Sequence, residues 1–134
     1  LAQSTYAPKE ILEILAKDKD SFVRAFIAEN PNVPKEILEF LAKDKNSLVR
    51  ASVAQNPNIS KEILEILAKD KDWTVRASAA QNPNITKEIL EILIEDKSPY
   101  IRLSAVKILE LLAKDKDSYA CLSATQNLNA FKEK

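Results

Sequence analysis

The chain has 134 residues with 20 basic and 20 acidic side chains, so its formal net charge is zero. It has one cysteine, no histidine and no glycine, which excludes an intrachain disulfide, a cysteine- or histidine-built metal site and the glycine-rich loops that bind nucleotides. No apolar run of about 18 residues and no secretory leader are visible, so we expect a cytoplasmic protein without a membrane-spanning segment.

A motif of 26 residues recurs along the chain. Its copies occupy, in order, 8–33, 34–59, 60–85, a shortened 86–104, and 105–130. The second and third copies differ at only six positions, so the repeat is not a chance pattern. Because both chain ends interrupt a copy, we expect residues 1–134 to form a single helical-repeat array that is a piece of a longer one.

Each copy opens with a segment of the type KEILEILAK, at residues 61–69 in the third copy. Its apolar side chains cover about 200° of a helix at 100° per residue. This width predicts an inner helix that is buried on more than one side, with Phe40 of the second copy in the core. The macrodipole favours acids in the first turn and lysines in the last. These are Glu10, Glu36, Glu62 and Glu88, and Lys17, Lys43 and Lys69.

A second helical segment follows in each copy and begins at a residue that caps helix N-termini well. The predicted caps are Asp20, Asn46, Asp72, Ser98 and Asp117. This segment stops where asparagine precedes proline, at Asn30, Asn56 and Asn82, and the Asn-Pro-Asn sequence makes the turn to the next copy. Helices of about nine residues are marginal alone. Stacking stabilises them, and the pattern therefore predicts an all-α fold, an α-solenoid of five two-helix repeats.

The fourth copy lacks seven residues, and with them the Asn-Pro breaker. Because seven residues are about two helical turns, the apolar face stays nearly in phase. We therefore predict one uninterrupted helix from Pro99 to about Lys114. The fifth copy is degraded, with Cys121 where arginine is expected, which is typical of a terminal cap.

The motif resembles the leucine-rich repeat variant family, which is related in architecture to HEAT repeats. The residues that carry the likeness are Val23-Arg24, Ala28, Asn30-Pro31, Pro34, Leu38, Leu41-Ala42, Asp44, Val49-Arg50 and Asn56-Pro57. The resemblance implies a right-handed superhelix in which one helix of a pair can be a 3₁₀ helix. It implies no enzymatic activity, and the lone cysteine gives no iron–sulfur site.

An arginine lies in the middle of the apolar arc of each regular second helix. These residues are Arg24, Arg50, Arg76 and Arg102. A buried guanidinium must be paired, and the candidate partners are Asp18, Asp44, Asp70 and Asp96, together with carbonyls at helix ends. We interpret the two columns as a structural ladder that sets the register between repeats, with a row of anion sites as the alternative.

Positions that vary between copies are the candidate partner-binding residues. Trp73 stands where the other copies have serine or proline. Phe22 and Phe26 are four residues apart on the outer arc of the second helical segment of the first copy. Tryptophan is enriched at binding hot spots. The alternatives are that Trp73 packs on a neighbouring loop and that the phenylalanines pack against a preceding repeat.

Lysines form two regular stripes, each with acidic neighbours, so a solvated, salt-bridged face is the better interpretation. The stripes are 9, 35, 61 and 87, and 19, 45, 71 and 97.

The leading hypothesis is a non-enzymatic scaffold that presents a curved surface to a protein partner, without cofactor, metal or membrane. One alternative is a HEAT-like nucleic-acid-binding array that uses the lysine stripes, which balanced charge disfavours. Another is a structural or designed repeat module without its own ligand, including one that associates end to end.

Overall fold

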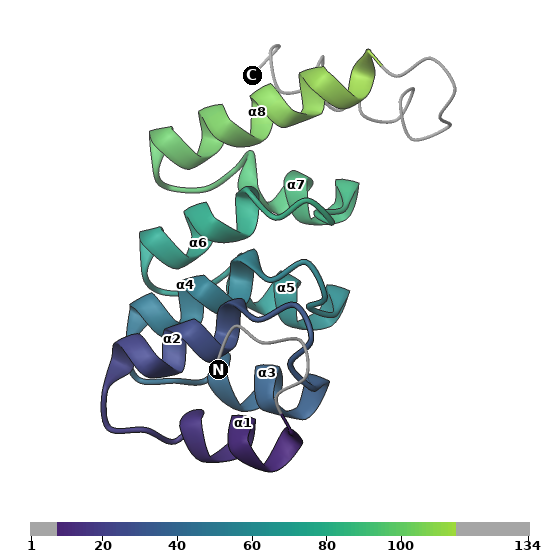
Figure 1. Cartoon of the computed structure of the whole chain (residues 1–134). Coiled ribbons are helices and arrows are strands. Elements are labelled where there is room, and N and C mark those ends of the chain that lie inside the picture. The colour runs from purple at the N-terminus through teal and green to yellow at the C-terminus, as the bar shows by residue number, and fades with distance from the viewer. Residues whose placement is uncertain (1–7, 115–134) are drawn as a thin grey trace. The chain divides into compact units, whose positions relative to one another are not determined.

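The computed structural model describes residues 8–114, which form eight α-helices and contain no strand and no 3₁₀ helix (Figure 1). The expected all-α class is therefore confirmed for this part of the chain. The helices are α1 (Lys9–Leu15), α2 (Ser21–Glu29), α3 (Lys35–Leu41), α4 (Ser47–Gln55), α5 (Lys61–Leu67), α6 (Trp73–Ala80), α7 (Lys87–Leu93) and α8 (Pro99–Ala113). The described residues fall into two compact units, the first ending at Asn84 and the second beginning at Ile85.

The predicted caps set the start of the helices. The side chains of Asp20, Asn46 and Asp72 accept hydrogen bonds from the amides of the second residues of α2, α4 and α6. The hydroxyl groups of Ser60 and Thr86 cap α5 and α7 by accepting hydrogen bonds from the amides of the third residues, Ile63 and Ile89. Ser98 occupies the cap position of α8 but makes no side-chain capping bond, and Pro99 follows it in the first turn. A cap of this kind contributes about 1 kcal/mol over alanine.

The helix ends differ in part from the prediction. The first helix of each repeat has only seven residues and ends before the lysines that were assigned to its last turn. That assignment is wrong because Ala16, Ala42 and Ala68 already close these helices, and the lysines belong to the following turn. The acidic residues do lie in the first turns, as predicted.

In the first unit the even-numbered helices pack against one another in the order α2, α4, α6, and each odd-numbered helix packs against the helix that follows it. The turns that lead from an odd to an even helix share one side, and those that lead back share the opposite side (Figure 1). The core lies between these helices and includes Ile27, Leu38, Val53 and Leu64, each at most 1% exposed. A buried aliphatic side chain of this size stabilises the fold by about 1.5–3 kcal/mol.

The odd-numbered helices are not inner helices. Ile14, Phe40 and Ile66, at equivalent positions of α1, α3 and α5, are 70%, 52% and 65% exposed. The expectation that the whole apolar arc is buried, with Phe40 in the core, is wrong. The reason is that the even-numbered helices supply the main contacts between repeats. α3 and α5 contact the even-numbered helices before and after them, and the face that carries Phe40 and Ile66 stays exposed.

In the second unit α7 packs against α8, and α8 runs without a break from Pro99 to Ala113. This confirms the predicted long helix to within one residue. Its buried side chains, Ile101, Ala105 and Leu109, recur every four residues. The predictions for Asp117 and Cys121 lie outside the described residues.

Candidate binding edge and the ladders that position it

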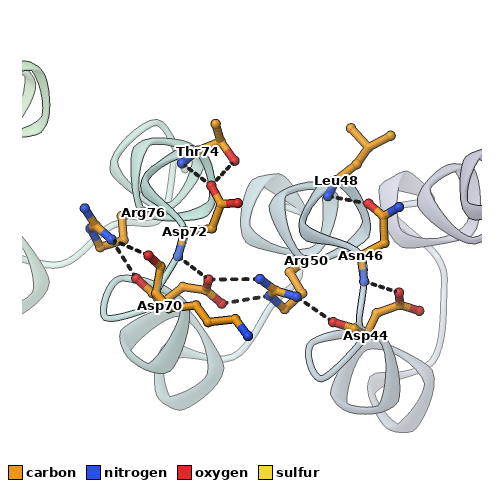
Figure 2. A network of polar contacts seen from close by, with 9 residues as sticks. Asp44, Asn46, Leu48, Arg50, Asp70, Asp72, Thr74 and Arg76 are labelled. Carbon is orange, nitrogen blue, oxygen red and sulfur yellow. Dashed lines mark hydrogen bonds and ion pairs between the residues drawn. The ribbon is translucent and has the colours of Figure 1, made fainter.

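Arginine and aspartate side chains of neighbouring repeats meet at the turns between odd and even helices. Arg50 leaves the first half of α4 and faces Asp70, which lies in the turn after α5 (Figure 2). Nε of Arg50 donates to Oδ2 of Asp70 at 2.9 Å, and a terminal nitrogen donates to Oδ1 at 3.2 Å. The pair is bidentate, the strongest geometry for guanidinium and carboxylate.

The same arrangement occurs one repeat earlier. Arg24 donates to Asp44 through Nε at 2.8 Å and through a terminal nitrogen at 3.2 Å. The remaining terminal nitrogen of each arginine bonds a backbone carbonyl of its own repeat, Asp18 for Arg24 and Asp44 for Arg50, both at 2.7 Å. Each guanidinium therefore joins two consecutive repeats while it is only 8% exposed.

The carboxylate of Asp44 is held in its charged form. Burial opposes its ionisation, but hydrogen bonds from Arg24 and from the Asn46 amide, together with the nearby positive charges, outweigh burial and lower the pKa of Asp44. The hydrogen bond to Asp44 in turn raises the pKa of Arg24. This partly buried pair is therefore ionic throughout the neutral range.

The later members of the arginine column keep the bond to their own turn. Arg76 donates to the carbonyls of Asp70 at 2.8 Å and Lys71 at 3.2 Å. In the second unit Arg102 donates to the carbonyl of Asp96 at 2.6 Å. Aspartates 18, 44, 70 and 96 also share a local role, since each accepts the backbone amide two residues ahead.

A second ladder, built from asparagine, lies at the opposite turns. The side-chain nitrogen Nδ2 of Asn56 donates to the backbone carbonyls of Ala28 at 2.7 Å and Asn30 at 3.0 Å, both in the preceding repeat. Asn82 repeats these bonds to Ala54 and Asn56 at 2.6 and 3.0 Å. Asn30, Asn56 and Asn82 are at most 2% exposed.

This asparagine ladder was missed by the sequence reasoning, which assigned Asn-Pro-Asn to a turn alone. The turn role exists, because the side-chain oxygen of Asn56 accepts the Asn58 amide at 2.8 Å. In addition, the side-chain amides of Asn58 and Asn84 donate to the carbonyls of Pro31 and Pro57. The sequence does contain a signal for this ladder, because the asparagine before each proline recurs unchanged. Proline alone would be enough to end the helix, so the constant asparagine indicates a further role.

The arginine ladder lies along an edge of exposed side chains. We use the term lysine edge for the exposed side chains of the odd-to-even turns and the helix starts that follow them in the first unit. They are Lys17, Lys19, Asp20, Phe22, Lys43, Lys45, Leu48, Lys69, Lys71, Trp73 and Thr74. Asp44 and Asp70, which lie between these lysines in the sequence, form ion pairs with Arg24 and Arg50.

The predicted partner-binding residues lie on or near this edge. Phe22 and Trp73, at the starts of α2 and α6, are 70% and 54% exposed. Phe26 lies one turn further along α2 and is 48% exposed, whereas its counterpart Ser52 in α4 is buried. The structure therefore brings Phe22 and Phe26 together on one helix, while Trp73 begins α6 two repeats away, one position before Thr74, the counterpart of Phe22.

A depression of about 860 Å³ lies between α1 and α3 at the lysine edge. Lysines 17, 19, 43 and 45 line it together with Phe40. Glu36 and Glu39 contribute carboxylates, and Glu36 lies 3.6 Å from the ammonium of Lys9. The depression has Ala16 and Phe40 as its apolar lining, and basic and acidic side chains occur around them in similar numbers, since Asp18 and Asp44 line it as well.

No model of a known protein family matches the chain, and comparison with curated proteins and with solved structures gives no match either. Within residues 8–114 no group of carboxylate or thiol side chains could hold a metal ion. None of the helices in that range combines the length and apolarity that crossing a membrane requires.

Proposed function

We propose that the chain is a non-enzymatic, cytoplasmic repeat scaffold that presents a preformed surface to a protein partner. In this proposal its repeats stack as a right-handed α-solenoid, as the resemblance to leucine-rich repeat variant proteins implies. The observation that carries the proposal is the double attachment of α4. Arg50 ties its first half to the next repeat, and Asn56 at its end ties it to the preceding one.

Double attachment favours recognition because a surface that is fixed in advance loses little conformational entropy on binding. Several exposed positions at the lysine edge differ between the copies, and Phe22, Leu48 and Trp73 occupy the helix starts there. Large aromatic side chains at exposed positions are the usual anchors of protein interfaces. A constant framework with variable exposed positions is the pattern that a binding scaffold requires.

A peptide-display selection on the immobilised protein tests this function. We expect enrichment of related peptide sequences, and loss of their binding when Phe22, Phe26 and Trp73 are replaced together by alanine. The matched control replaces Leu103 of α8, which is 68% exposed, by alanine. If no sequence is enriched, or if the triple variant binds unchanged, the chain is a structural module or uses another surface.

A further inference from the structure

We propose that the lysine edge binds an acidic peptide segment that carries large apolar side chains; this rests on the proposed function and names its partner class. Each of the three repeats of the first unit contributes two exposed lysines and one exposed large apolar residue to this edge. Charge and apolar contact therefore recur together once per repeat.

The positive charge of the edge follows from the arginine ladder. Adjacent aspartates neutralise neighbouring lysines only when their carboxylates are free to face them, and those of Asp44 and Asp70 are engaged by Arg24 and Arg50. Their side chains are only 8% and 11% exposed. Because Arg24 and Arg50 share these carboxylates with the neighbouring lysines, the turns that contain Lys43, Lys45, Lys69 and Lys71 carry an excess of positive charge, although the net charge of the whole chain is zero.

The apolar part of the edge can hold side chains of a partner. The depression between α1 and α3 places Phe40, half exposed, beside four lysines and the carboxylates of Glu36 and Glu39. Phe22, Leu48 and Trp73 add one anchor at each helix start, and lysine stems extend the apolar area around them. A segment in which carboxylates alternate with large apolar residues would match both features.

A nucleic acid fits this edge less well. Asp72 stands beside Trp73, and hydrogen bonds from the Thr74 hydroxyl and amide at 2.6 and 2.8 Å lower its pKa and keep it charged (Figure 2). Glu39 contributes a further carboxylate to the depression. A phosphate backbone carries one charge per nucleotide and would meet these groups, whereas a peptide can place its carboxylates elsewhere.

The test measures binding of the full chain to fluorescent peptides by anisotropy at two salt concentrations. The probes are a glutamate-rich peptide with two phenylalanines, the same peptide with alanines instead, and a lysine-rich version. We expect the first to bind most tightly, the alanine version about tenfold more weakly, and the lysine-rich version not at all. Higher salt should weaken the first complex, since exposed charges contribute to it.

Variants locate the site. Alanine at Lys17, Lys19, Lys43 and Lys45 together should weaken binding about tenfold or more, and so should alanine at Phe22 and Trp73 together. The control for the lysine variant combines Lys35→Ala with Lys107→Ala, and the control for the aromatic variant is Leu103→Ala. Both alter exposed residues elsewhere and should leave affinity unchanged.

Three outcomes would overturn the inference. The first is absence of acidic-peptide binding at low salt, and the second is equal binding by the edge and control variants. The third is tighter binding of single-stranded oligothymidylate or duplex DNA than of any peptide, which would assign the edge to nucleic acid. If display still selects other peptides, the scaffold function stands although this partner class does not.

Discussion

Arg50 and Asp70 illustrate how a charged pair can be accommodated in an apolar layer. The guanidinium meets both carboxylate oxygens and a backbone carbonyl, and the carboxylate also accepts the Asp72 amide at 2.9 Å. The cost of removing both ions from water is therefore offset by several charge-assisted bonds. Removing only one partner would leave the other buried and uncompensated.

We expect Arg50→Ala to lower the free energy of unfolding by about 3–5 kcal/mol, because Asp70 then loses both side-chain bonds. Urea denaturation followed by circular dichroism measures this loss. The exposed Lys35→Ala variant should change stability by less than about 0.5 kcal/mol. A double-mutant cycle with Asp70→Asn should show coupling of at least about 1 kcal/mol. Independent effects of the two substitutions would argue against the pairing.

Asp44 gives the ladder a defined pH dependence. Because its pKa is lowered in the folded protein, its ionised form stabilises the fold above its unfolded pKa of about 3.9, and this contribution disappears as pH falls through the folded pKa. Asp44→Asn should therefore reduce stability at pH 7, and the gap to the wild type should narrow towards pH 3. Urea denaturation at both values measures it. Glu13→Gln on the exposed face of α1 is the control, and a gap that stays constant would contradict the assignment.

At the scale of the helices, α4 is attached to its neighbours near its start by Arg50 and at its end by Asn56, while Arg24 attaches α2 and Asn82 attaches α6 to an adjacent repeat. The arginine bonds hold the odd-to-even turns of adjacent repeats together, and the asparagine bonds hold the even-to-odd turns. Two attachments at opposite ends of a helix restrict both its sliding and its rotation against the neighbour. Apolar packing between α2, α4 and α6, by contrast, is non-directional.

Asn56 should matter more than its exposed neighbour Asn58. Asn56→Ala removes two bonds to buried carbonyls and the turn bond to the Asn58 amide, so we expect a loss of about 3 kcal/mol. Asn58→Ala removes a solvent-exposed bond to Pro31 and should cost about 1 kcal/mol or less. Thermal and urea unfolding of both variants provide the comparison. Equal losses would show that the buried amide has no special role.

Helix caps and helix ends that depend on nearby residues could be predicted from the sequence. Which side of each helix is covered by neighbouring helices could not be predicted. The caps of α2, α4 and α6 and the uninterrupted α8 depend on residues within one or two turns, and these predictions are confirmed. The exposure of Phe40 and Ile66 depends on which helices contact the next repeat, and an apolar arc does not contain that information. The asparagine ladder has the same cause, since its acceptors are 26 and 28 residues away.

At the scale of the first unit, three helix pairs share one layer of contacts. Within a repeat, α3 and α4 touch each other, but α4 has more extensive contacts with α2 and α6, which belong to the adjacent copies. Val49, Val53 and Ala54 are completely buried there. A single copy therefore buries too little apolar surface to offset its conformational entropy.

A peptide of residues 34–59 should consequently be unfolded in water at 25 °C, although it contains both helices and their caps. Without its neighbours it loses the α2 and α6 contacts of α4 and both ladders, while α3 and α4 are too short to persist alone. Circular dichroism should give a coil spectrum without a cooperative thermal transition, against a helical, cooperative spectrum for the whole chain. A folded, cooperative peptide would mean that each copy is a domain in itself, and the ladders would then join independent units instead of creating one.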